Sequence, residues 1–100
     1  MLTSKQRAAL RRQANGLEPV FQLGKGEADE ALTRAVADCL AARELIKLKV
    51  LPTSPYTPKE AAALLAGGTG AEVVQVIGSK LVLFLQKPED SRFSGLLAGL

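Results

Sequence analysis

The chain has 100 residues, of which 47% are hydrophobic, 23% charged and 4% aromatic, and its formal net charge is +3. This length and composition fit one folded domain and exclude a multidomain enzyme or a disordered polymer. Histidine is absent and Cys39 is the only cysteine, so histidine-dependent triads, the usual zinc sites and an internal disulfide are excluded. We therefore expect no enzyme activity, no metal and no cofactor.

The apolar stretches of the sequence are too short for a membrane span, which needs roughly 18 residues. The longest cover residues 61–66 and 81–85, and the basic residues near the N-terminus have no apolar segment of a signal peptide behind them. We expect a cytoplasmic protein without a membrane partner. A monomer is favoured, although the sequence leaves the oligomeric state open.

Charge is distributed unevenly along the chain. Residues 1–26 have five basic residues against one acidic residue, residues 27–44 have two against five, and residues 45–60 have three against one. This segregation predicts one side that faces a polyanion and an opposite, solvated side. A basic surface without a specific partner would give similar charge counts and is the alternative interpretation.

The first elements are expected to be a helix over residues 4–15 and a strand over 20–23. Thr3 and Gln6 form a capping-box pattern at the start of this helix, and Gly16 is a typical residue after a helix end. Pro19 precedes the strand, as is common at strand starts.

A second helix is predicted to begin after Asp29, which is a good N-cap residue. Apolar residues recur at i, i+3, i+4, i+7 and i+8, so one side of the helix is expected to face the core. These residues are Leu32, Ala35, Val36, Cys39 and Leu40. Cys39 is interpreted as a buried small hydrophobe rather than a reactive thiol.

Residues 45–50 alternate between apolar and basic side chains, which predicts a half-buried strand with a basic exposed face at Lys47 and Lys49. A third helix is expected from Thr57, with Pro58 in its first turn, to about Ala66. Gly67 and Gly68 are expected to stop this helix.

Two aliphatic runs, residues 73–77 and 81–85, surround Gly78 and Ser79 and predict a hairpin. The element order is then α-β-α-β-α-β-β. Strands joined through helices are expected to pair in parallel by right-handed crossovers, and the hairpin must be antiparallel. The predicted fold class is α/β (α+β), with a mixed four-stranded sheet packed by helices.

The turn Gly24, Lys25, Gly26 delivers two glycines and a lysine to the start of a helix, where backbone N–H groups and the helix dipole favour an anion. Phosphate is the natural candidate, and a plain turn is the alternative. Asp29 stands where a dinucleotide fingerprint has its third glycine, and residues 67–70 lack the lysine of a P-loop. A nucleotide-binding enzyme is therefore the least favoured of the functions considered for this chain.

Several segments, taken in order over about residues 3–86, together resemble a CRM domain of the bacterial YhbY type. They are Leu10, Ala14, Leu17 and Pro19, then Leu23-Gly24-Lys25, then 44–50, 75–78 and 81–84. The resemblance implies an RNA-binding module with a fold similar to the C-terminal domain of a bacterial translation initiation factor. It also implies association with precursors of the large ribosomal subunit. The family's G-x-x-G loop, similar in use to that of KH domains, falls on residues 24–27, with Glu27 in place of the second glycine.

We therefore predict an RNA-binding protein that binds ribosomal RNA and acts in assembly of the large (50S) ribosomal subunit. A domain of residues 1–86 is followed by a tail of residues 87–100. The candidate RNA-binding residues are Gly24, Lys25, Gly26, Arg11, Arg12, Lys47 and Lys49.

The alternative function is a protein-interaction or adaptor module that uses the basic face or the tail. In the tail, Phe93, Leu96, Leu97 and Leu100 fall at helical spacing and are able to dock on a partner or on the domain itself. The glycines of the tail and its terminal position instead favour a frayed or disordered segment.

Overall fold

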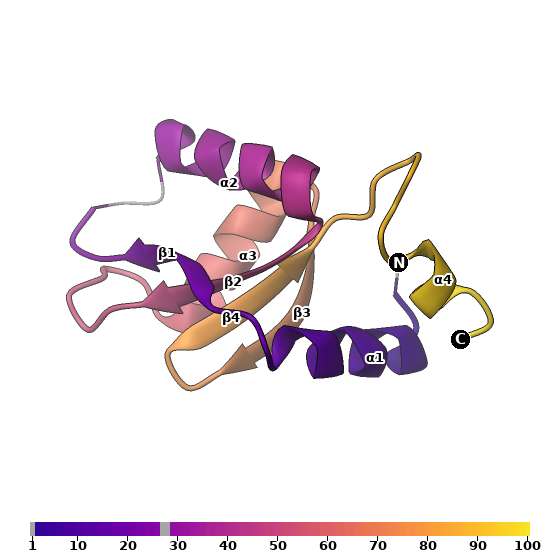
Figure 1. The fold of residues 1–100 in the computed structure, drawn as a ribbon. Coiled ribbons are helices and arrows are strands. Elements are labelled where there is room, and N and C mark those ends of the chain that lie inside the picture. Colours follow the sequence, from indigo (N-terminus) through magenta and orange to yellow (C-terminus); the bar gives the residue numbers. More distant parts are fainter. Residues whose placement is uncertain (1, 27–28) are drawn as a thin grey trace.

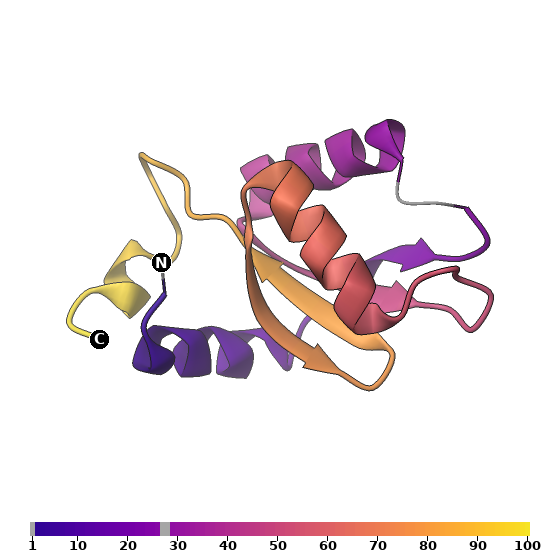
Figure 2. The same cartoon turned by 180° about the vertical axis from the view of Figure 1, so that it is seen from behind.

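The computed structural model describes residues 2–26 and 29–100. Its elements are α1 (Ser4–Ala14), β1 (Pro19–Leu23), α2 (Glu30–Arg43), β2 (Leu45–Val50), α3 (Pro58–Thr69), β3 (Glu72–Ile77), β4 (Lys80–Phe84) and α4 (Ser94–Leu97). The four strands form one sheet, with α1 on one face and with α2 and α3 on the other (Figure 1, Figure 2). The predicted mixed, four-stranded α+β architecture is confirmed.

Side chains that cap the helices fix where they begin. At α1 the Gln6 amide N–H donates to Thr3 Oγ1 at 3.1 Å, and the Thr3 N–H donates to Gln6 Oε1 at 2.9 Å. The same reciprocal pair joins Thr57 and Glu60 at the start of α3. These bonds satisfy N–H groups that have no partner inside the helix. Both predicted capping boxes are therefore confirmed.

The predicted end of the third helix is wrong, because α3 continues past Ala66 to Thr69. Gly68 lies inside the helix, where a Cβ atom would come within 2.7 Å of Thr33 Cγ2 on α2. A glycine there allows the two helices to approach closely. Gly70 caps the end of the helix, and its φ of 81° belongs to the left-handed region that glycine adopts easily.

The strand order in the sheet is β1-β2-β4-β3, with β1 and β2 parallel and both contacts of β4 antiparallel. The expectation that β2 and β3 pair in parallel is wrong, because β4 lies between them. Burial explains this order. All of residues 81–84 are buried, which suits a central strand, whereas Val76 and Ile77 on β3 are 39% and 61% exposed, which suits an edge.

Two hydrophobic clusters fill the two interfaces of the sheet with its helices. The cluster under α2 and α3 is the larger and contains Val36, Leu40, Leu48, Leu65 and Leu81 among others. The α1 cluster consists of Leu10, Ala14, Leu45, Val74, Val82, Phe84 and Leu97.

The core face of α2 is narrower than predicted. Ala35 is exposed, and Cys39 is only half-buried, although it packs against the larger cluster. Full burial is limited to Val36 and Leu40. No helix in the described part of the chain is long and apolar enough to span a membrane.

The C-terminal segment docks on its own domain, so the expectation of a frayed or disordered tail is not met. Leu97 on α4 is buried in the α1 cluster, and Gln6 Nε2 on α1 donates to the Leu97 carbonyl oxygen at 3.4 Å. The Phe93 ring meets Phe84 edge to face, with centroids 5.4 Å apart and planes at 86°. Part of the apolar stripe that an adaptor would present is therefore used within the molecule, beside the start of α1 (Figure 1).

Candidate nucleic-acid interface

The lysines of β2 lie on the α1 face of the sheet. Leu45 packs in the α1 cluster, whereas Ile46 and Leu48 pack in the larger cluster under α2 and α3. Because side chains alternate along a strand, Lys47 and Lys49 share the side of Leu45. Both are half-buried, so the stems are covered while the charged ends can reach solvent. The predicted alternation is confirmed.

The register of the sheet adds a cation that the sequence analysis missed. Lys80 on β4 is paired directly with Lys49 on β2, so the two side chains lie on the same face. Like charges in directly opposite positions of an antiparallel pair destabilise the sheet. Only the pairing of β2 with β4 reveals this arrangement, because the two lysines are far apart in the sequence.

Helix α1 contributes further cations to this side. Its sequence has four basic residues and no acidic one, and Arg11 and Arg12 occupy its last turn, the former half-buried and the latter exposed. Arg7 was also missed as a candidate. Its Nε atom is buried without a hydrogen-bond partner, while the rest of the side chain is part-exposed.

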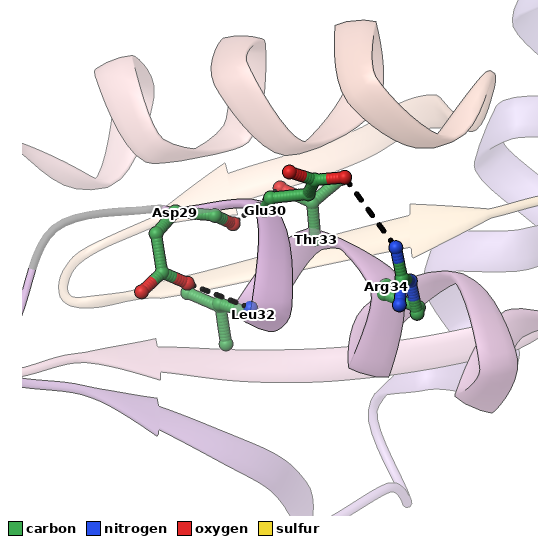
Figure 3. A network of polar contacts seen from close by, with 5 residues as sticks. All are labelled: Asp29, Glu30, Leu32, Thr33 and Arg34. Atoms are coloured by element: carbon green, nitrogen blue, oxygen red, sulfur yellow. Dashed lines mark hydrogen bonds and ion pairs between the residues drawn. The ribbon is translucent and has the colours of Figure 1, made fainter.

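Acidic partners for these cations are missing among residues 2–26 and 29–100. The one ion pair found there joins Arg34 to Glu30 at 3.4 Å on α2, on the opposite face of the sheet (Figure 3). The same part of the chain has no group of three or more side chains able to hold a metal ion. The cations of the α1 face therefore form no ion pair within the described residues.

The turn of Gly24, Lys25 and Gly26 follows β1 and lies beside the loop after β2 (Figure 1). A Cβ atom at Gly24 would lie 3.5 Å from Thr53 Oγ1, which is ordinary contact, and one at Gly26 would meet no atom of a described residue within 4 Å, its chain neighbours aside. Neither glycine has a left-handed backbone. No contact among the described residues therefore requires these glycines, and neither carries a side chain that would cover its own main chain. Glu27 lies outside the described residues, so the prediction for it is unchanged.

The start of α2 is occupied by the chain's own carboxylates. Asp29 Oδ1 accepts a hydrogen bond from the Leu32 N–H at 2.8 Å, and Glu30 follows in the first turn (Figure 3). Negative side chains here already complement the helix dipole and would repel a phosphate. An anion is better placed on the Lys25 side chain and the glycine main chain than at the helix terminus.

The candidate residues are spread in a row that follows β1 and its neighbour β2, rather than gathered in one compact cluster. Arg11 and Arg12 precede the start of β1, and the glycine turn follows the end of β1. The two ends of this strand are about 13 Å apart at roughly 3.3 Å per residue. Lys47 is in register with Pro19 and Lys49 with Gln22, so the two lysines fill the interval.

Glu44 is the buried charged residue of the described chain, and it fixes the segment that leads to α4. Its carboxylate accepts hydrogen bonds from the Ser91 hydroxyl, from the Arg92 N–H at 2.8 Å and from the Lys87 N–H at 3.1 Å. Burial raises the pKa of Glu44, but these hydrogen bonds outweigh it and hold the pKa below its ordinary value of 4.5. The carboxylate is therefore ionised at neutral pH.

Comparison with known proteins agrees with this architecture. The chain matches the CRS1 / YhbY (CRM) domain over residues 2–84. It is 38% identical over 92 residues to YqeI of Bacillus subtilis (strain 168), a protein named as a probable RNA-binding protein, covering 92% of this chain and 96% of YqeI. It is 42% identical over 85 residues to MJ0652 of Methanocaldococcus jannaschii, named in the same way, covering 83% of this chain and 63% of that protein.

A solved structure shares the fold. The solution structure of SAV1595 from Staphylococcus aureus has a TM-score of 0.76 and 42% sequence identity with this chain, and the match covers 91% of this chain and 95% of that one. The resemblance found in the sequence is thereby confirmed. The fold, the match over residues 2–84 and these relatives together place the chain in the CRS1 / YhbY (CRM) domain family.

Proposed function

We propose that this protein binds RNA through the α1 face of its sheet and the adjoining glycine turn. The observation that carries the proposal is the direct pairing of Lys49 with Lys80, neither of which has an acidic partner among the described residues. Such a pair lowers the stability of the sheet, and it is useful when a polyanion neutralises both charges. The relatives that are named as RNA-binding proteins support RNA as that polyanion.

The expected mechanism is recognition of the RNA backbone, with no catalytic step. Arg11, Arg12, Lys47 and the opposed Lys49 and Lys80 contact phosphates along the row. Lys25 contacts a phosphate that approaches the main chain of the glycine turn. Phosphate contacts position a strand without reading its sequence. If four to five phosphates are neutralised, the log–log salt slope for single-stranded RNA should be about −3 to −3.5.

A reversal of charge at Lys25 tests the turn. Lys25→Glu should weaken binding of a labelled single-stranded ribosomal RNA fragment several-fold in fluorescence anisotropy, with a nearly unchanged thermal midpoint, because Lys25 is exposed. Lys59→Glu is the matched control, since Lys59 is an exposed lysine on α3, behind the other face of the sheet. Equal affinities of the wild type and the Lys25 variant would remove the turn from the mechanism.

We further propose that the RNA is ribosomal and that the protein acts in the cytoplasm during assembly of the large (50S) subunit. Support for this step comes from the family resemblance. The test is to crosslink the protein to RNA in cells, fractionate ribosomal particles and sequence the attached RNA. Enrichment of large-subunit RNA in precursor particles is expected, and crosslinks to unrelated RNAs outside these fractions would contradict the assignment.

A further inference from the structure

A hollow of about 500 Å³ opens where the C-terminal segment passes the first residues of β1 and β2. Its volume falls within the range of about 300–1,000 Å³ that is typical of ligand pockets. Leu17, Val20 and Phe93 are among its apolar lining residues. Phe93 comes from the C-terminal segment, beyond the residues 2–84 that match the CRM domain, so this chain's own tail completes the hollow.

Three cations from three different parts of the chain line the same hollow. Arg43 ends α2, Lys47 lies on β2, and Arg92 lies in the segment before α4. None of them has an acidic partner within the described ranges, and Glu18 is the only acidic residue in the lining. The hollow therefore attracts an anion while it offers apolar surface to a flat ring.

The start of β2 adds hydrogen-bonding capacity to the hollow. Pairing with β1 begins at Lys47, opposite Pro19, so Leu45 and Ile46 have no strand partner on this side in the described structure. Both residues line the hollow. A free strand edge presents unpaired main-chain N–H and C=O groups, which are able to bond the polar edge of a base.

Glu44 acts as a positioning residue for this site. Its carboxylate accepts the Arg92 N–H at 2.8 Å, and in sequence it directly follows Arg43. Phe93, the residue after Arg92, is held by the edge-to-face contact of its ring with Phe84. The tail residues of the hollow are therefore fixed before any ligand arrives, which reduces the entropy that binding would cost.

We infer that this hollow binds one nucleotide unit of a single-stranded RNA. The base lies against Leu17, Val20 and Phe93, and its phosphate is bound by Arg43, Lys47 and Arg92. A base that has left a helix can enter such a recess, whereas a base within a duplex cannot. The inference rests on the proposed function and adds to it a second contact, at the opposite end of the row from the glycine turn.

The test uses the full chain, with labelled hexauridylate as the RNA probe and uridine monophosphate as the free nucleotide. Arg92→Gln should lower hexauridylate affinity roughly three- to ten-fold and reduce the magnitude of the salt slope by about 0.7, the loss of one phosphate contact. Arg43→Gln should have a similar effect, and it does not depend on the tail. Arg34→Gln is the control, since it removes the same charge from an exposed arginine of α2 that is paired with Glu30 and lies outside the hollow.

In NMR titrations of the wild type, hexauridylate should shift the amide signals of Leu17, Val20 and Lys47 at lower concentration than the monophosphate. The inference is overturned if Arg92→Gln and Arg43→Gln bind hexauridylate as Arg34→Gln does, or if the monophosphate alone occupies the hollow. Either result, combined with weakened binding by Lys25→Glu, leaves the proposed function standing. A wild type that binds neither hexauridylate nor ribosomal RNA would instead contradict the proposed function.

Discussion

The two faces of the sheet are built differently. The face under α2 and α3 buries the larger cluster, and both helices on it have an acidic residue in the first turn, Glu30 in α2 and Glu60 in α3, which α1 lacks. The α1 face buries a smaller cluster and carries cations without acidic partners among the described residues. The difference indicates that one face supplies most of the stability and that the other tolerates repulsion for the sake of binding.

The cations of the α1 face reduce stability in two identifiable places. Arg7 and Arg11 are four residues apart on α1, where like charges repel by a few tenths of a kcal/mol. Lys49 and Lys80 oppose each other across β2 and β4. The variants that follow are ordered from the largest expected effect to the smallest.

The first prediction compares the two clusters directly. Leu48 is fully buried under α2 and α3, and Leu48→Ala should lower the free energy of unfolding by about 3–5 kcal/mol. Leu97 lies at the end of α4, where local structure opens more easily, and Leu97→Ala should lower the free energy of unfolding by only about 2 kcal/mol, the low end of the usual range. Urea denaturation measures both. Equal losses would show that the two faces contribute alike.

The second prediction concerns the buried carboxylate that anchors the tail. Glu44→Gln should lower the free energy of unfolding by about 1.5–3 kcal/mol at pH 7, because it weakens hydrogen bonds to a charged group. The native pKa of Glu44 lies below 4.5, so its stabilisation is present above that pH and is lost as the pH falls through the native pKa. Between pH 7 and pH 3, the free energy of unfolding should therefore fall more steeply for the wild type than for Glu44→Gln. Parallel curves would contradict this assignment.

The third prediction separates stability from binding on the α1 face. Lys49→Glu replaces a like-charge pair with an attractive one opposite Lys80, so it should raise the free energy of unfolding by about 0.2–1 kcal/mol. The same change should weaken RNA binding several-fold. Thermal melts and anisotropy measure the two effects. A variant that loses both stability and affinity would mean that Lys49 serves the fold rather than a ligand.

An effect on stability no larger than that at Lys49 is expected at the glycine turn. A Cβ atom at Gly26 meets no atom of a described residue within 4 Å, its chain neighbours aside, and Gly26 is outside the left-handed region. Gly26→Ala should therefore change stability by less than about 1 kcal/mol, in the stabilising direction. RNA affinity should nevertheless fall, because the methyl group covers main chain that a phosphate would approach. Unchanged affinity would assign the glycine to a plain turn.

Local patterns were sufficient for much of the fold. The capping boxes at Thr3 and Thr57, the Asp29 cap and the alternation around Lys47 depend on residues within a few positions of one another, so the sequence alone predicts them. The strand order was not predictable in this way, because neighbouring segments do not determine that β4 lies between β2 and β3. The extension of α3 through Gly68 likewise depends on contact with Thr33 of another helix.

The candidate site shows the same limit. Lys25, Lys47 and Lys49 were found from local charge and periodicity, and they stay predictions. The pairing of Lys80 with Lys49, and the partners of Glu44 more than 40 residues away, appear only when the chain is folded. The hollow completed by the tail is the clearest case, because a terminal segment with two glycines has a local pattern that favours disorder.

The opposed lysines of β2 and β4 also bear on how the protein should be handled. Concentrated electrolyte shields them from each other, which should raise the melting temperature, and it should at the same time strip co-purifying nucleic acid. Dilute buffers should lower the melting temperature and retain the nucleic acid. At high salt concentration the protein should thus have the least bound nucleic acid and the highest melting temperature. Such a preparation is a poor starting point for affinity measurements until it is dialysed in the presence of the ligand.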